Sequence, residues 1–422
     1  MSDDKIGLWS VVAIGVGGMV GGGIFAVLGL AVQLAHGGTP IAFLVAGMVA
    51  LVTAHSYARL SVRYQSQGGT VVFVDRAFGR DLLTGSLNTL LWVSYVVMLA
   101  LYAFAFGSYG ATFFPGSGII TRHLIISAGI LIPTALNMLA ASIIGKAETW
   151  VVAIKVTILV GFVAVGLTGV DPSNLAPSEW AAPVPLVAGG MIIFLAYEGF
   201  ELIANAAPDI VSPKRNIPRA YYIAVVFVML LYVVIAIVTV GSLAFDRVAQ
   251  AQDYVLAEAA RPVLGQAGFT IITIAALIST FSAINASLYG GSRVNYEIAE
   301  DDELPRHFLA QVWNQPVGLL VTAVATLVVV NSFGLESIST AGSISFIGIF
   351  GLVNVVAYRR HRETGARRGI ALAGAVACFV ALGVLVRQQL LGGPTGVYLS
   401  AGIIAACFLL EWGYKRWERR SA

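Results

Sequence analysis

The feature that most constrains this chain is a cluster of glycines in the middle of an apolar segment. The segment extends from about residue 9 to residue 34, and a helix that spans a bilayer needs about 20 apolar residues. Within it, six of the eleven residues Gly15–Phe25 are glycine, and each costs roughly 1 kcal/mol relative to alanine inside a helix. The segment therefore predicts a transmembrane helix that breaks near the middle of the membrane.

A break at this depth frees backbone groups that lipid cannot satisfy, so they must face protein, water or a ligand. We expect the half-helix that begins near Gly21 to direct its free N–H groups at the break, where they can bind a carboxylate. The half-helix that ends near Gly17 presents carbonyl oxygens, which suit an ammonium group or a cation. One broken helix could thus bind both ends of a zwitterion. The alternative is close helix packing, because the same glycines form two GxxxG pairs.

The rest of the chain is also largely apolar. Of its 422 residues, 58% are hydrophobic and 11% are charged, which predicts an all-α polytopic membrane protein. The apolar segments predict twelve transmembrane helices, near residues 9–34, 40–62, 82–113, 119–141, 147–170, 184–207, 219–243, 268–298, 316–332, 338–358, 370–391 and 396–413.

Lysine and arginine are unevenly divided between alternate loops. With the N-terminus in the cytoplasm, the inner loops and termini carry 20 of them and the outer loops carry four, Arg122, Arg247, Arg261 and Arg387. Because cytoplasmic loops are the ones enriched in lysine and arginine, we expect a plasma membrane protein with both termini in the cytoplasm.

The sixth apolar segment is interrupted as the first one is. Phe194–Glu201 places Glu198, Gly199 and Glu201 in an otherwise apolar run, and buried acids in a membrane helix are usually functional. A first and a sixth helix that both break suggest two inverted repeats with a binding site between them. We predict one domain over 1–422, with a first repeat in 1–170, a second in 171–360 and two peripheral helices in 361–422.

Four stretches together resemble the motifs of amino acid–polyamine–organocation (APC) permeases. They occur in the same order as in that family, over about 300 residues. They are Gly21-Gly22-Gly23-Ile24-Phe25, residues 66–79, Phe194–Glu201 with the following 209–220, and Ser292-Arg293 with Glu303-Leu304-Pro305.

The resemblance implies a LeuT-type fold, with five plus five inverted helices, broken helices 1 and 6 and two peripheral helices. It also implies an amino acid bound between the breaks, its carboxylate on N–H groups of Gly22 and Gly23 and its amine on carbonyls near Met19 and in the sixth helix. An alternative to substrate binding is a structural role. In that case Phe194 and Tyr197 pack in the core, and Glu198 and Glu201 accept hydrogen bonds from N–H groups freed at the break. The expected substrate-binding residues are Met19, Val20, Gly21, Gly22, Gly23, Phe194, Leu195, Ala196, Tyr197 and Glu198.

Lys155 is the only charged residue in the stretch 151–160. A lysine at the centre of a membrane helix costs roughly 2.5–3.5 kcal/mol. It could instead snorkel, because Trp150 marks an interface only about 7–8 Å away. In proton-coupled APC permeases a helix-5 lysine occupies the place of sodium in sodium-coupled relatives. The resemblance therefore implies proton coupling through Lys155, together with the Gly17 carbonyl and the hydroxyls of Ser279 and Ser282.

These observations predict a secondary active transporter that moves amino acids with protons by alternating access. Open alternatives are amino acid/product exchange, a carrier of polyamines or cationic amino acids, and a membrane amino acid sensor without transport. We expect no enzyme, because no cluster of catalytic groups is present. The two cysteines and five histidines form no metal-binding pattern, so we expect no metal, cofactor or nucleic-acid partner. The sequence leaves the oligomeric state open.

Overall fold

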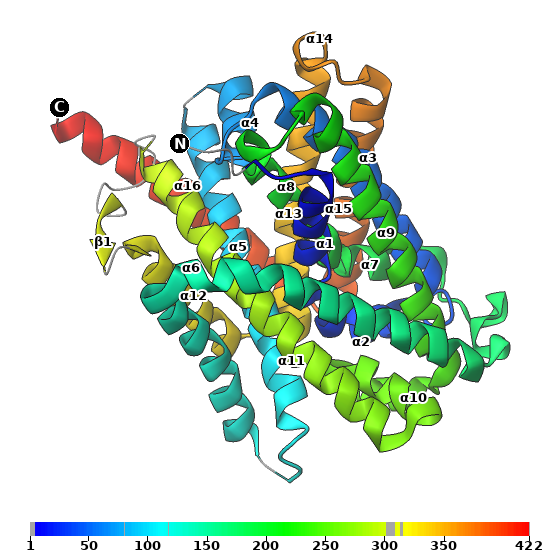
Figure 1. Ribbon diagram of the computed structural model, residues 1–422. Coiled ribbons are helices and arrows are strands. Elements are labelled where there is room, and N and C mark those ends of the chain that lie inside the picture. Colours follow the sequence, from blue (N-terminus) through cyan, green and yellow to red (C-terminus); the bar gives the residue numbers. More distant parts are fainter. Residues whose placement is uncertain (1–4, 80, 117, 301–308, 313–314, 422) are drawn as a thin grey trace.

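The computed structural model describes residues 5–79, 81–116, 118–300, 309–312 and 315–421 (Figure 1). Almost all of the regular structure in these residues is helical. The exceptions are two short antiparallel strands, β1 (Gln311–Val312) and β2 (Gln315–Pro316). The motif residues Glu303-Leu304-Pro305 lie outside the described residues.

The described helices follow the predicted apolar segments closely. The α-helices are α1 (Leu8–Met19), α2 (Gly23–Ala35), α3 (Thr39–Arg63), α4 (Thr70–Phe78), α5 (Leu82–Ala111), α6 (Ile119–Gly166), α7 (Pro183–Ile192), α8 (Leu202–Asn205), α9 (Pro213–Ser242), α10 (Phe245–Gln250), α11 (Val255–Glu300), α12 (Val317–Ser332), α13 (Leu335–Arg359), α14 (His361–Thr364), α15 (Arg368–Gly392) and α16 (Thr395–Ser421). The 3₁₀ helices are η1 (Leu167–Gly169), η2 (Pro172–Leu175), η3 (Pro177–Glu179), η4 (Phe194–Glu201), η5 (Ala207–Asp209) and η6 (Gln252–Tyr254).

Most of these helices can cross a membrane. Among the described residues, nine helical stretches are long and apolar enough to do so, and two bent pairs could each form one more. Two of the nine, at 119–138 and 150–169, lie in the long helix α6 and its 3₁₀ continuation η1, so the two apolar segments predicted at 119–141 and 147–170 form one continuous helix. Helix α11 is kinked at Gly265, whose φ of +62° suits glycine. The apolar helix α12 has only 16 residues. The structure thus confirms a polytopic helical protein, and the number twelve stays a prediction.

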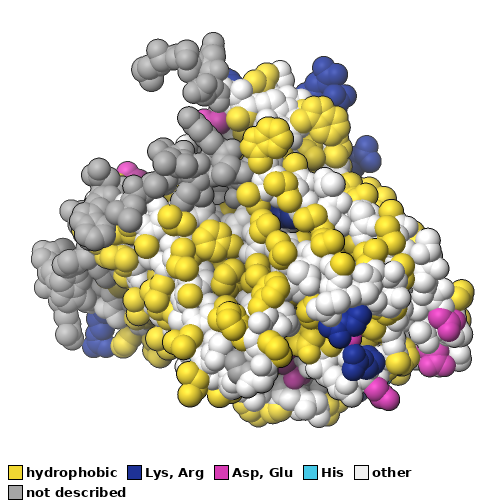
Figure 2. Space-filling view, turned by 60° about the horizontal axis from the view of Figure 1, so that its bottom comes forward, with side chains coloured by type: hydrophobic (Ala, Val, Ile, Leu, Met, Phe, Trp, Pro, Cys, Tyr) yellow, Lys and Arg dark blue, Asp and Glu magenta, His cyan; other side chains and the backbone are white. Residues whose placement is uncertain are grey.

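The surface of the protein is apolar over wide areas. Figure 2 shows hydrophobic side chains spread over one face, with few charged side chains among them. Large side chains such as Ile120 and Leu391 are each 73% exposed. Soluble monomers rarely expose such extended apolar surface, so this surface fits contact with lipid.

The centre of the fold is helix α5, whose side chains are buried along most of its length. It packs against α6, α11, α12, α13 and α16. Helices α4 and α14 lie at one end of the molecule and α10 lies at the other (Figure 1). The two bent pairs lie beside this central helix, and the candidate site is built where they meet.

Candidate functional site at the two helix breaks

The first break lies between α1 and α2. Helix α1 ends at Met19, α2 begins at Gly23, and their axes differ by 48°. The end and the start are each two residues later than predicted. The first amide of α2 to bond back within the helix is that of Ala26, to the Gly22 oxygen at 3.0 Å. The preceding N–H groups, beginning with that of Gly23, therefore lack an intrahelical acceptor and form a positive helix end.

The second break lies in the predicted sixth segment. Helix α7 ends at Ile192, and the chain continues as the 3₁₀ helix η4 over Phe194–Glu201 before α8. The two halves are bent by 41°. Residues three apart lie on the same side of a 3₁₀ helix, so Glu198 and Glu201 share one face of η4.

The two breaks touch each other through their backbones. A Cβ atom built on Gly199 would lie 2.1 Å from the carbonyl carbon of Gly18. One built on Gly23 would lie 2.7 Å from the Cα atom of Ala196. Only glycine permits so close an approach of two backbones. The glycines of the two segments thus allow α1, α2 and η4 to meet.

Hydroxyl groups of other helices satisfy several carbonyls at the first break. Ser279 Oγ on α11 donates to the oxygens of Val20 and Gly21 at 3.0 and 2.9 Å. Tyr232 on α9 donates its hydroxyl to the Met19 oxygen at 2.6 Å and lies 3.4 Å from the Ala196 oxygen. The Met19 and Ala196 carbonyls are among those expected to bind the substrate amine. In this conformation the Tyr232 hydroxyl is their hydrogen-bond donor instead.

Tyr232 is a residue of the site that no sequence pattern indicated. It is one of several hydroxyl residues in the apolar helix α9, and such residues most often pack or bond to a neighbouring helix. The structure shows that it contacts both breaks.

Lys155 lies beside the end of α1. Its side chain is fully buried, and its Nζ atom donates to the Gly17 oxygen at 3.0 Å. The structure therefore brings Lys155 and Gly17 together. Ser279 bonds to the neighbouring carbonyls of the same break, and Ser282 is buried on the same helix as Ser279. The lysine thus ties α6 to the first break.

Glu201 binds hydroxyl groups of three distant segments. Its carboxylate accepts from Tyr95 at 2.6 Å, Tyr57 at 3.2 Å and Thr70 at 3.3 Å. The structural alternative predicted that freed backbone N–H groups would bond to this carboxylate. The partners in the structure are side-chain hydroxyl groups instead. Glu201 is the last residue of η4, and there its carboxylate reaches hydroxyl groups of α3, α4 and α5.

Glu198 has a different environment. Its side chain is fully buried, and neither carboxyl oxygen accepts a hydrogen bond from an N–H or hydroxyl group of the described residues; its nearest ionisable neighbour is the Glu201 carboxyl. It lines a cavity of about 120 Å³, next to Gly17, Gly18 and Tyr102. A buried polar group without a partner is costly. We therefore expect the Glu198 carboxyl to bind a ligand, a water molecule or a proton.

This cavity lies next to a larger one. The larger cavity, of about 500 Å³, is lined in part by Gln67, Asp209 and Arg293. The two share the lining residues Ile14, Leu202 and Ala286. Together the two cavities extend from the helix breaks to the residues around α8 and η5.

The expected aromatic and aliphatic site residues make packing contacts. The rings of Phe194 and Phe350 meet edge to face, 5.8 Å apart. Tyr197 donates its hydroxyl to the Phe43 oxygen at 3.0 Å. Leu195 packs where Gly342 leaves room for it. These contacts favour the packing alternative for Phe194 and Tyr197.

Two broken membrane helices that meet at a buried polar centre are typical of secondary transporters. The protein is thus a multi-pass membrane protein of the transporter class. Comparison with known sequences identifies the family: the family model described as "Amino acid permease" matches residues 6–410. The chain belongs to the amino acid permease family, within the APC superfamily.

Its relatives agree with this assignment. An uncharacterized protein of Methanocaldococcus jannaschii is 35% identical over 100% of this chain and 98% of its own length. The inner membrane transport protein YbaT of Escherichia coli is 33% identical over 87% of this chain and 86% of its own length. The branched-chain amino acid permease BcaP of Bacillus subtilis is 25% identical over 71% and 68%, respectively. The protein is therefore an amino acid transporter and not an enzyme.

Proposed function

We propose that the protein imports amino acids together with protons across the plasma membrane by alternating access. In this proposal the chain crosses the membrane twelve times, with both termini in the cytoplasm. Residues 1–170 and 171–360 form the inverted repeats of a LeuT-type core, and 361–422 forms the peripheral pair. The observation that carries the proposal is the hydrogen bond from the buried Lys155 ammonium to the Gly17 oxygen at the first break.

The proposed substrate site lies between the two breaks. The α-carboxylate binds at Gly21–Gly23, where the start of α2 offers N–H groups without an intrahelical acceptor. The α-ammonium binds carbonyl oxygens of Met19 and of the 3₁₀ helix η4. This assignment is supported by the contact of Gly23 with Ala196, which places the two halves of the site side by side.

Lys155 is the proposed proton carrier. When protonated, its ammonium group donates to Gly17 and holds the end of α1 against α6. When the proton leaves, the neutral amine is a weaker partner for this oxygen, and α1 is freer to move away. The small cavity next to Gly17 and Gly18, and the larger one beside it, lie on the side toward which we expect α1 to open.

Uptake into proteoliposomes tests this proposal. We expect the wild type to take up labelled amino acids when a proton gradient is imposed, without sodium. Lys155→Ala should still insert and bind substrate but lose the pH dependence of uptake. Thr157→Ala, on an exposed position of the same helix, is the matched control and should behave as the wild type. Sodium-driven uptake, or unchanged pH dependence in Lys155→Ala, would contradict proton coupling through this lysine.

A carrier of cationic amino acids is the second candidate, because the buried Glu198 carboxyl lines the cavity at the break and accepts no hydrogen bond from an N–H or hydroxyl group of the described residues. In that case a substrate ammonium would lie in the cavity beside it. Competition by lysine and by leucine distinguishes the two candidates. If Glu198→Gln weakens lysine binding at least tenfold and leaves leucine binding unchanged, the cationic substrate is favoured.

A further inference from the structure

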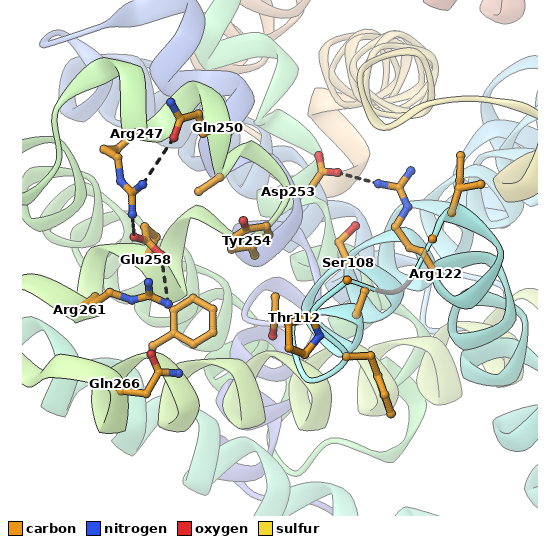
Figure 3. Close-up of a pocket in the computed structure, with 18 residues that line it drawn as sticks. Ser108, Thr112, Arg122, Arg247, Gln250, Asp253, Tyr254, Glu258, Arg261 and Gln266 are labelled. Atoms are coloured by element: carbon orange, nitrogen blue, oxygen red, sulfur yellow. Dashed lines mark hydrogen bonds and ion pairs between the residues drawn. The ribbon is translucent and has the colours of Figure 1, made fainter.

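A third, larger pocket shares no lining residue with the two cavities at the helix breaks (Figure 3). Its volume is about 790 Å³, within the usual size of a ligand pocket. It is formed by the end of α5, the start of α6, the segment from α10 to η6, and α11 on both sides of its kink. In the proposed orientation these elements face the outside of the cell.

This pocket collects most of the outer positive charge. Three of the four arginines assigned to outer loops, Arg122, Arg247 and Arg261, line it. Outer loops of membrane proteins are poor in arginine and lysine, so this grouping is unusual. Two carboxylates, Asp253 and Glu258, also line the pocket. The charged side chains of the lining therefore leave one net positive charge.

The ion pairs in the pocket leave hydrogen-bond donors unused. Arg122 binds Asp253 at 3.1 Å, and Arg247 and Arg261 share Glu258 at 2.6 and 3.6 Å (Figure 3). Among the described residues, the buried Nε atoms of Arg122 and Arg261 have no hydrogen-bond partner.

A buried hydroxyl adds a third unused group. Ser108 is only 4% exposed and its Oγ atom has no hydrogen-bond partner among the described residues. In Figure 3 it lies beside the Arg122–Asp253 pair. Since buried polar groups normally have partners, these three donors indicate a bound group with several acceptor oxygens.

The rim of the pocket is apolar where α5 turns into α6. Phe114 and Ile119 line it and are 56% and 67% exposed. In a membrane protein such side chains suit contact with lipid chains. The pocket thus offers arginine donors inside and an apolar edge outside.

We propose that this pocket binds the phosphate group of an anionic phospholipid of the outer leaflet. A phosphodiester carries one negative charge, which matches the net charge of the lining, and arginine is well suited to phosphate oxygens. Glycerol hydroxyls of a headgroup can bond to the uncharged Thr112, Gln250 and Gln266, which also line the pocket. A zwitterionic amino acid has no net charge to match. The leaflet follows from the proposed orientation, whereas the phosphate site itself does not depend on transport.

Native mass spectrometry and thermal unfolding of the purified protein test the site. The probe is phosphatidylglycerol in detergent, compared with phosphatidylcholine and with inorganic phosphate. We expect the wild type to retain phosphatidylglycerol and to be stabilised by it. Arg261→Gln should weaken this binding at least about tenfold, because it removes a charged hydrogen-bond donor. Ser108→Ala, a smaller change in a buried position, should weaken it severalfold.

The matched control is Arg387→Gln, which removes the exposed outer arginine that does not line the pocket. It should retain lipid as the wild type does. Equal phosphatidylglycerol binding by wild type, Ser108→Ala and Arg261→Gln would overturn the proposal. So would equal stabilisation by inorganic phosphate or by a free amino acid at the same concentration, because either would show that the pocket selects something other than a lipid.

Discussion

The contact between the two breaks makes Gly199→Ala a sharp test of the site. The added Cβ would lie 2.1 Å from the carbonyl carbon of Gly18 and 2.5 Å from its oxygen and from the Met19 nitrogen. All three atoms belong to the backbone, so no side chain can rotate away. Overpacking usually costs about 1–3 kcal/mol, and we expect the upper end of this range. At an unfolding entropy of roughly 2 cal/mol/K per residue, 3 kcal/mol lowers the midpoint of a chain of 422 residues by about 3.5 °C.

The assay compares thermal unfolding and amino acid uptake of Gly199→Ala with those of Gly383→Ala. Gly383 is an exposed helical glycine with nothing within 4 Å of its Cβ position, so alanine there should stabilise the helix by up to about 1 kcal/mol. We expect Gly199→Ala alone to lose stability and at least tenfold in uptake, because the breaks must move apart. Uptake and stability equal to those of the control would refute backbone contact between η4 and α1.

Three further predictions concern the same site. Gly23→Val should abolish uptake while the protein still inserts, because its side chain would collide with Ala196; Gly383→Val is the control, and wild-type affinity in Gly23→Val would place the carboxylate elsewhere. Tyr232→Phe should lower stability by about 1–3 kcal/mol, since it leaves buried carbonyls without their donor; the exposed Tyr398→Phe should not, and an unchanged unfolding midpoint would contradict the role of this hydroxyl. Decarboxylated and N-acetylated amino acids should both fail to compete for uptake, and strong competition by a simple amine would exclude a zwitterion site.

Local sequence was sufficient to predict the helices and the positions of their breaks. The length of an apolar segment decides whether a helix can cross a bilayer, and clustered glycine weakens the helix where it occurs. Both are local properties. For this reason Gly15–Phe25 and Phe194–Glu201 were located correctly, with the end of α1 and the start of α2 shifted by only two residues.

Only the tertiary structure could decide which polar groups meet at these breaks. Tyr232 lies 213 residues from Met19 along the chain, and Tyr95 lies 106 residues from Glu201. The local sequence around a hydroxyl in an apolar helix does not indicate its hydrogen-bond partner, because the partner depends on the rotation and packing of whole helices. The same holds for Ser108 and the three arginines around it, which come from four separate elements. The sequence therefore determined where the backbone of this protein breaks, and helix packing determined which side chains satisfy the breaks and which were left without a partner.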